Sequence, residues 1–450
     1  MSGKTAPYAL KSAITTGILG SPESIHLHSC KTQPLALFYD LNVFENGLKN
    51  VQNAFGKGFM HAIAVKSNPV CNMLELAMKQ GLGAECASIG EVLNCLKVGF
   101  LPDKIVYDSP VKTASEIRFA LERGIHINAD SIQEIHIINE ELQKLKKTNS
   151  TIGLRVNPLV GKGEIHELST ATATSKFGVA LNEHFKGEVL EYYAKYPWLT
   201  AMHVHIGSQS YGVTELANGL RTAVLFALEV NDHLGRNQVN VFDIGGGLPV
   251  NRDDDEISPT FDDYAGKLKS IIPELFPSNG VFRRVVTEFG QALNAKTGWL
   301  ASRVEYVKQS GSEDVDIILS HIGADLCMRT CYCPNQRKYQ RRIEIYDSDG
   351  CLKTGKKRCY NIAGPLCFSG DVIKYNIHLP EVIRGDYIVV LDCGANSLSV
   401  FNRHCSRFAP SVFGYRKREN ESVEFTVLKE AETTEELLKF WGDKNQLSPK

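Results

Sequence analysis

Short hydrophobic runs of strand-like composition recur along the chain from residue 61 onward, and segments of helical period separate them. The segment 88–99 is typical of these helices, because Ile89, Val92 and Leu96 fall on one face. Eight strand-like runs in alternation with helices favour a TIM-like (β/α)8 barrel with the helices outside. The runs are HAIAVKS (61–67), GAECAS (83–88), KIVYDS (104–109), HINADS (126–131), TIGLRVNP (151–158), LTAMHVHIG (199–207), NVFDIGGG (240–247) and RVVTEFG (284–290).

The pattern changes after about residue 295. Runs such as WLASRVEYVKQ and DYIVVLDCG are joined by turns, with few helical segments between them. This indicates a separate antiparallel β domain. The first 33 residues also lack the alternation of strands and helices, so we assign them to that domain. The sequence therefore predicts an α/β protein with a barrel at 34–294 and a sandwich- or barrel-like β domain formed by 1–33 and 295–450.

The composition is that of a globular protein and excludes several classes of partner. The 50 Lys and Arg residues balance 51 Asp and Glu, which gives no electrostatic basis for binding nucleic acid or an anionic membrane. No run of 18 apolar residues occurs, so we expect no membrane-spanning helix. Twelve cysteines are too dilute for a disulfide scaffold and indicate a reducing, cytoplasmic setting. The CMRTCYC string at 327–333 lacks the spacing of paired zinc ligands, so we expect no metal.

Reactive side chains fall at the ends of the strand-like runs, where a (β/α)8 barrel carries its chemistry. Lys66 closes an apolar run, and burial there would lower the pKa of its amine and suit it to Schiff-base formation. On its own it is better explained as a lysine that extends to solvent. His205 ends another run on the same predicted face as His203, which we interpret as a hydrogen-bonded core histidine.

Three glycines and a carboxylate complete the set. The N–H groups of Gly245, Gly246 and Gly247 could converge on a phosphate, although a tight turn explains these glycines as well. Glu288, near the end of the last run, could pair with a cationic ring nitrogen or form a structural ion pair. These residues together provide an amine, a flat ring, a phosphate-binding loop and a carboxylate at one end of the barrel. This combination favours pyridoxal phosphate as the cofactor. Its protonated ring accepts the electron pair released when a bond to the Cα of an amino acid breaks.

Eight strings carry a family resemblance over roughly residues 34–415. They are AVKSNP, ECASIGE, STATATSKFG, HVHIGSQ, DIGGGLP, TEFG, GPLCFSGD and DCGA, in that order. In this ordered set the chain resembles the barrel-type, alanine-racemase-like pyridoxal phosphate-dependent decarboxylases, which include diaminopimelate, ornithine and arginine decarboxylases. HIGSQ and STATATSKFG are closer to the diaminopimelate branch than to the ornithine branch.

The resemblance implies roles for individual residues and a homodimer with shared active sites. Lys66 would form the Schiff base, and His205 would stack on the cofactor ring. Ser208 and the three glycines would hold the cofactor phosphate, and Cys367 of the second subunit would return a proton to Cα. The cofactor-binding set implied by the resemblance is Lys66, Glu85, His205, Ser208, Gly245, Gly246, Gly247, Glu288 and Asn396.

The chain departs from the family pattern where the substrate is expected. Gln291 stands where the family has Arg, and Phe368 stands where an acidic residue usually follows the active-site Cys. Arg329 is displaced by one position, after Met328, and Asn396 replaces a cofactor-contacting Tyr. Because an unpaired buried charge costs several kcal/mol, we expect this pocket to reject diaminopimelate. The expected substrate-binding residues are Gln291, Met328, Arg329, Phe368 and Asp371.

The leading hypothesis is therefore decarboxylation of an amino acid other than diaminopimelate to an amine and carbon dioxide. A racemase or epimerase in the same barrel stays open, because Lys66 and Cys367 could serve the two faces of Cα. A catalytically inactive homologue that binds a partner protein also stays open, although the residues of the chemistry are all retained.

Overall fold

The computed structural model describes residues 2–20, 32–161, 163, 169–209, 211–276, 280–312 and 314–442. The chain forms two compact units. One unit, the barrel unit, comprises Glu45–Asn251 and Ile257–Leu293. The other, the β unit, comprises Met1–Phe44, Arg252–Glu256 and Asn294–Lys450.

The barrel unit is built on eight parallel strands that close on themselves. Each strand pairs in parallel with its neighbours, and the β5–β6 and β10–β2 pairings complete the ring. This confirms the predicted (β/α)8 barrel, and all eight strand-like runs contain a strand. The strands are β2 (Phe59–Ala64), β3 (Gly83–Cys86), β4 (Ile105–Tyr107), β5 (His126–Ala129), β6 (Ile152–Asn157), β8 (Leu199–His203), β9 (Val241–Asp243) and β10 (Arg284–Phe289), while β7 (Val179–Ala180) adds to β6.

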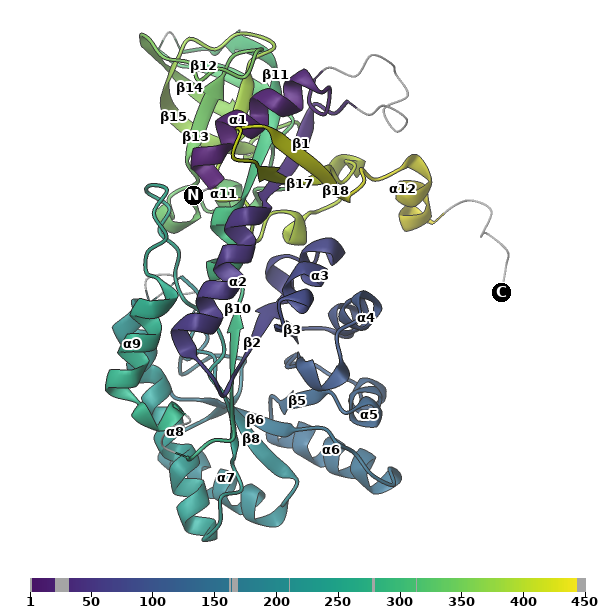
Figure 1. Ribbon diagram of the computed structural model, residues 1–450, viewed down its shortest axis with the longest axis vertical. Helices are drawn as coiled ribbons and strands as arrows, with labels where there is room; N and C mark the ends of the chain where they lie inside the picture. Colours follow the sequence, from purple (N-terminus) through teal and green to yellow (C-terminus); the bar gives the residue numbers. More distant parts are fainter. Residues whose placement is uncertain are drawn as a thin grey trace. The chain divides into compact units, whose positions relative to one another are not determined.

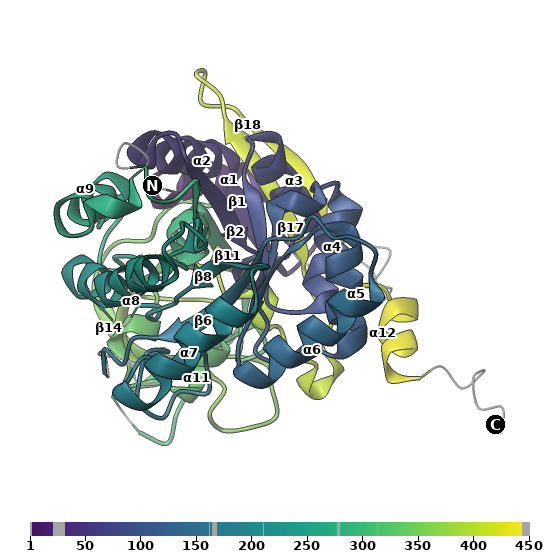
Figure 2. The same cartoon turned by 90° about the horizontal axis from the view of Figure 1, so that it is seen from below.

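Helices cover the outside of these strands (Figure 2). Sequence signals fix several of their ends: the Thr113 hydroxyl accepts the Glu116 N–H at the start of α5, and Gly124 ends that helix in the left-handed conformation. The helices are α2 (Leu41–Phe55), α3 (Cys71–Lys79), α4 (Ile89–Val98), α5 (Ala114–Arg123), α6 (Ile132–Lys144), α7 (Glu183–Lys195), α8 (Val213–Leu234) and α9 (Phe261–Ile271), with the short α10 (Gln291–Asn294) after β10.

The β unit contains a mainly antiparallel sheet in the order β15-β14-β12-β11-β1-β17-β18, and β16 joins β11 to β13 (Figure 1). Only the β1–β17 and β12–β14 pairs among its strands are parallel within the described residues. The strands are β1 (Leu35–Asp40), β11 (Gly298–Gln309), β12 (Asp316–Ser320), β13 (Ile343–Tyr346), β14 (Lys357–Ala363), β15 (Val372–Pro380), β16 (Tyr387–Val390), β17 (Ser411–Lys417) and β18 (Val423–Lys429). Its helices are α1 (Ser2–Thr15), α11 (Met328–Tyr332) and α12 (Thr434–Trp441).

The strand β1 marks a difference from the predicted boundary, which placed residues 34–44 in the barrel. Leu37 pairs with Leu300 on β11 and with Val412 on β17, so β1 lies inside the sheet of the β unit. A fully apolar run such as LALFY fits either environment, because its pattern does not specify which strands lie beside it. The core of this unit includes Leu10 of α1, Phe38 and Trp299. None of the described helices is long and apolar enough to cross a membrane.

Candidate active site

The reactive side chains of the barrel unit gather at the carboxyl ends of its strands. Lys66 lies in a single 3-10 turn, Val65–Ser67, directly after β2 rather than in the strand itself. This turn packs closely against Gly290, at the end of β10. A Cβ at position 290 would lie only 3.0 Å from the Ser67 Cβ, so the glycine makes the close approach possible. The other members of the cluster are Glu85 on β3, Asp108 after β4, His203 at the end of β8, His205 just beyond it, Asp243 at the end of β9 and Glu288 on β10.

Lys66 is held by a short contact with Glu85. Its ammonium donates a hydrogen bond to Glu85 Oε1 at 2.6 Å. The Lys66 side chain is 49% exposed, whereas the Glu85 side chain is fully buried. Burial opposes the charge on the amine, but Glu85, Asp108 and Glu288 together raise the pKa of Lys66 above its ordinary value. The expected lowering of this pKa is therefore wrong for the side chain in this structure. The apolar run did not predict the carboxylates around Lys66.

Glu288 is a buried carboxyl group that could accept a hydrogen bond from a cationic group. Its Oε1 is buried and has no hydrogen-bond partner among the described residues. Burial, reinforced by the nearby Asp108, raises the pKa of Glu288 to about 8. One side-chain nitrogen or oxygen atom from each of Asp108, His203 and Glu288 lies within 4.8 Å of the other two. The Glu288 carboxyl group therefore has a second acidic group close by. A protonated pyridine nitrogen would give the orphaned oxygen a donor and offset the negative charge, so the residues present fit the cofactor.

His205 presents a neutral ring. Its Nδ1 accepts the N–H of Gly246 at 3.1 Å, so the proton of the neutral imidazole lies on Nε2. Burial, with Arg155 and Lys66 nearby, holds the pKa of His205 well below its ordinary value. A neutral, fixed ring is suited to stack on a flat cofactor. The interpretation of His203 is corrected: it is buried, but neither ring nitrogen has a hydrogen-bond partner among the described residues.

The three glycines after β9 are required by close backbone packing. A Cβ at Gly246 would lie 2.1 Å from the Glu288 carbonyl oxygen, and one at Gly247 would lie 2.0 Å from that of Gly207. The N–H of Gly245 donates to Asp243 Oδ1 at 3.0 Å, while that of Gly246 is bonded to His205. These bonds conflict with the predicted phosphate contacts of Gly245 and Gly246. The phosphate role therefore stays a prediction for Gly247 and Ser208.

Gln291 lies beside the predicted phosphate residue. Its Nε2 donates to Ser208 Oγ at 3.5 Å. We predicted Gln291 as a substrate contact, but this bond places it at the Ser208 end of the barrel rim. Its amide can donate to an anion, although it lacks the positive charge that an arginine would bring.

The remaining predicted residues form a second group, in the β unit. The loop between β14 and β15 carries Cys367, which is exposed and whose N–H donates to Cys405 Sγ at 3.4 Å. The buried Asp371 fixes this loop, because its two carboxylate oxygens accept the N–H groups of Ala324 and Leu366, both at 2.6 Å. The sequence predicts Asp371 as a substrate contact. In the structure Asp371 is better placed to hold the Cys367 loop.

Phe368 belongs to an aromatic group next to Cys367. Its ring stacks on Tyr332 with centroids 5.5 Å apart and packs edge-on against His404 at 6.0 Å. Met328 lies four residues before Tyr332 on α11, and both it and Arg329 are half-buried. Burial lowers the pKa of Arg329. Asn396, the expected replacement for Tyr, adopts a φ of 54°, which asparagine tolerates better than most residues.

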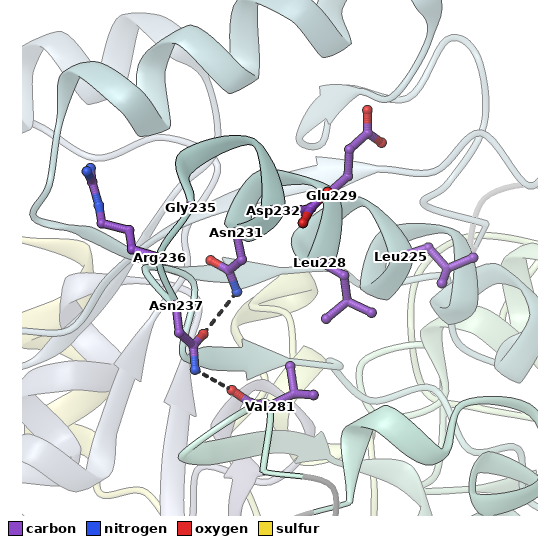
Figure 3. A pocket seen from close by; sticks show the side chains of 9 residues that line it. All are labelled: Leu225, Leu228, Glu229, Asn231, Asp232, Gly235, Arg236, Asn237 and Val281. Atoms are coloured by element: carbon purple, nitrogen blue, oxygen red, sulfur yellow. Dashed lines mark hydrogen bonds between the residues drawn. The ribbon is translucent and has the colours of Figure 1, made fainter.

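A shallow pocket elsewhere in the barrel unit lacks these features (Figure 3). It is lined by the carboxyl-terminal part of α8 and by the segments that lead into β9 and β10, so it lies at the amino ends of the strands. Asn237 bonds to Asn231 and to the Val281 carbonyl across it. Residues at this end of a (β/α)8 barrel serve stability, whereas the opposite end carries the chemistry.

Comparison with known proteins decides the family. The family model for the pyridoxal-binding domain of pyridoxal-dependent decarboxylases matches residues 41–295. The chain belongs to the pyridoxal-dependent decarboxylase family. It is therefore a pyridoxal phosphate-dependent amino acid decarboxylase by class, as predicted, and its cofactor is pyridoxal phosphate.

Individual relatives point to one branch of this decarboxylase family. The diaminopimelate decarboxylase of Zymomonas mobilis is 29% identical, over 93% of this chain and 92% of that protein. The enzyme of the same name from Aquifex aeolicus is 30% identical, over 83% and 88%. The crystal structure of diaminopimelate decarboxylase from Helicobacter pylori complexed with L-lysine has a TM-score of 0.78 and 25% identity, over 91% and 97%. These matches support the resemblance to the diaminopimelate branch.

The sequence-based reasoning assigned no role to three titratable residues at this end of the barrel, Asp108, Arg155 and Asp243. Asp108 ends the run KIVYD, as Glu288 closes VVTE, so the strand-end rule that selected Glu288 also selects Asp108. Arg155 lies on β6 3.6 Å from Asp130 and over the ring of Phe177. An arginine inside a strand carries no comparable signal, because the sequence does not show which way it points.

Proposed function

We propose that this decarboxylase acts on an amino acid other than diaminopimelate and releases the corresponding amine and carbon dioxide. The observation that supports this is the aromatic pair Phe368–Tyr332 beside Cys367. In the family pattern an acidic residue stands at position 368, where it can hold a distal amino group. The phenylalanine at this position offers that group no carboxylate to balance its charge. An apolar or aromatic substrate side chain suits this surface better.

Individual residues have distinct parts in the proposal. Lys66 would hold the cofactor covalently through its amine. Glu288 would accept a hydrogen bond from the pyridine nitrogen, and His205 would stack on the ring. Bound pyridoxal phosphate supplies an acceptor for the electron pair left at Cα when the carboxylate departs. Cys367 of the second subunit would deliver a proton to Cα from its thiol.

The proposal includes a homodimer, because the family resemblance assigns Cys367 to the active site of the second subunit. It also includes a cytoplasmic setting, which the reduced cysteines of the sequence favour. Sedimentation of the holoenzyme tests the dimer directly, and a monomer with full turnover contradicts it.

Diaminopimelate itself is the second candidate, since the relatives named above are diaminopimelate decarboxylases. The experiment that separates the two is carbon dioxide release from a panel of L- and D-amino acids that includes diaminopimelate, with mass spectrometry of each amine. We expect kcat/KM for diaminopimelate to fall at least about 100-fold below that of the best substrate, which corresponds to roughly 3 kcal/mol of lost contacts. Diaminopimelate as the best substrate contradicts the proposal.

A matched pair of variants sharpens this test. Phe368→Glu restores the family's acidic residue, whereas Phe368→Leu changes the size of the side chain and adds no charge. If the aromatic residue excludes a distal amino group, only Phe368→Glu raises relative turnover of diaminopimelate, by about tenfold or more. An equal response of both variants contradicts the assignment of Phe368 as the specificity residue.

A further inference from the structure

A second buried carboxylate stands beside the partner of Lys66. Glu85 pairs with Val106 in the register of β3 and β4, and Asp108 follows two residues later. Glu85 is 0% exposed and Asp108 is 5% exposed. Neither the family strings nor the sequence analysis assign a role to Asp108.

The contacts of these two carboxyl groups favour one shared proton. Glu85 Oε1 accepts from Lys66 at 2.6 Å, but Glu85 Oε2 is buried and meets no donor among the described residues. Its neighbour is the Asp108 carboxyl group, which as a carboxylate can only accept. One proton on the pair gives both groups a hydrogen bond and removes the repulsion between two adjacent negative charges.

The surroundings decide which member keeps the charge. Burial acts to raise the pKa of both carboxyl groups. For Glu85 this effect outweighs the opposing effect of Lys66, so the pKa of Glu85 lies well above its ordinary value. For Asp108 the nearby Lys66, the His203 ring at 3.6 Å and the hydrogen bond with Glu85 lower the pKa below its ordinary value instead. Among the described residues, the charged and titratable groups that face the pair are Lys66, Cys86, Glu91, His126, Arg155, His203, His205, Asp243 and Glu288.

We propose that Asp108 is a positioning residue of the Lys66 site: it carries the negative charge of a carboxyl pair that shares one proton, and Glu85 is the protonated member. The Lys66 amine thus hydrogen-bonds to a neutral acid, while the charge that balances it lies one side chain further into the barrel, close to His203. The inference concerns the site of the proposed function, but its test needs no turnover. A failure of one therefore leaves the other standing.

The experiment measures the titration of Lys66 in the cofactor-free protein. The rate at which an amine-reactive reagent labels Lys66 is followed against pH by peptide mass spectrometry, because only the free amine reacts. Three variants are compared: Glu85→Gln, which mimics a protonated Glu85, Asp108→Asn, which removes the charge of Asp108, and the double variant. Asp103→Asn is the matched control, since Asp103 is an exposed carboxylate just before β4, at its opposite end.

The proposal predicts the order of the labelling rates at a fixed pH below the titration midpoint of Lys66. Glu85→Gln and Asp103→Asn stay within about twofold of the wild type, Asp108→Asn labels about tenfold faster, and the double variant labels at least as fast as Asp108→Asn. Tenfold corresponds to about one unit in the pKa of Lys66. If Glu85→Gln labels as fast as Asp108→Asn or faster, or if Asp108→Asn matches the wild type, the proposal is overturned.

A second measurement tests the protonation of Glu85 without labelling Lys66, and it uses only Glu85→Gln, in which the side chain keeps its size. The infrared spectrum of the cofactor-free protein at pH 7, minus that of Glu85→Gln, should contain the carbonyl band of a protonated carboxylic acid. A difference spectrum with only carboxylate bands shows that Glu85 is ionised, and this overturns the proposal as well.

Discussion

The Lys66 ammonium and Glu85 Oε1 lie 2.6 Å apart, at a boundary between a half-exposed amine and a fully buried acid. The exposed side leaves the amine within reach of an aldehyde, while the buried side fixes its position. The carboxyl groups of Glu85, Asp108 and Glu288 together raise the pKa of Lys66, so the amine is in its charged form. A nucleophile of this kind needs a proton acceptor when the cofactor arrives.

Glu288 should make the cofactor-free protein less stable as the pH rises. An acid whose pKa is raised from 4.5 to about 8 in the folded state binds its proton more tightly when folded, so its contribution is present at low pH and is lost between about pH 4.5 and 8. Glu288→Gln removes this dependence. Urea unfolding at pH 5, 6.5 and 8 should show that the wild type loses at least about 1 kcal/mol more than the variant over this range. Glu122→Gln, on the exposed surface of α5, is the control, and parallel curves for wild type and Glu288→Gln would refute the expectation.

Cys367→Ala should abolish most turnover and leave the cofactor in place. A missing proton donor costs about 100- to 10,000-fold in kcat, because Cα must then take its proton from water. The visible absorbance of the bound cofactor should be unchanged, since its covalent link is to Lys66. The exposed Cys351 of the same unit provides the control variant Cys351→Ala. Turnover within threefold of the wild type would remove Cys367 from the reaction.

Cys405 should control the reactivity of Cys367. A hydrogen bond and charge repulsion from the Cys405 thiol raise the pKa of Cys367. Cys405→Ala therefore lowers that pKa, and at pH 7.5 a larger fraction of Cys367 is thiolate. We expect iodoacetamide to alkylate Cys367 several-fold faster in the variant, measured by peptide mass spectrometry. Cys405→Ser keeps a hydrogen-bonding group at the position and should respond less; slower alkylation in Cys405→Ala would exclude the effect.

Asp371→Asn should destabilise the β unit. Each oxygen of Asp371 accepts a backbone N–H at 2.6 Å, and the asparagine amide would turn an N–H group toward one of these donors. Loss of one charge-assisted bond and the buried conflict together cost about 2 to 4 kcal/mol. Urea denaturation measures the change, with the exposed Asp349→Asn as the control. A variant that is as stable as the wild type would show that these bonds are not important.

The sequence was a good guide to the barrel and a poorer guide to the contacts within it. Period and composition located every barrel strand, because each strand is a short apolar run that ends in polar residues. The same rule brought Lys66, His205 and Glu288 to one rim. It did not predict the raised pKa of Lys66, which depends on carboxylates from other strands.

The β unit shows the same limit. Motif spacing identified the loop around Cys367, but only the structure shows that both oxygens of Asp371 are used by the backbone. Likewise the partners of β1 lie more than 250 positions further along the chain, where no local pattern can reveal them.

This separation between β1 and its partners has a consequence for synthesis. β1 is made early, yet its antiparallel partner β11 begins at Gly298 and its parallel partner β17 begins at Ser411. During translation the apolar β1 therefore remains without its sheet while the whole barrel emerges from the ribosome. A chain that stops before Ser411 leaves one edge of β1 open, so premature termination should yield an aggregating fragment rather than a smaller stable domain.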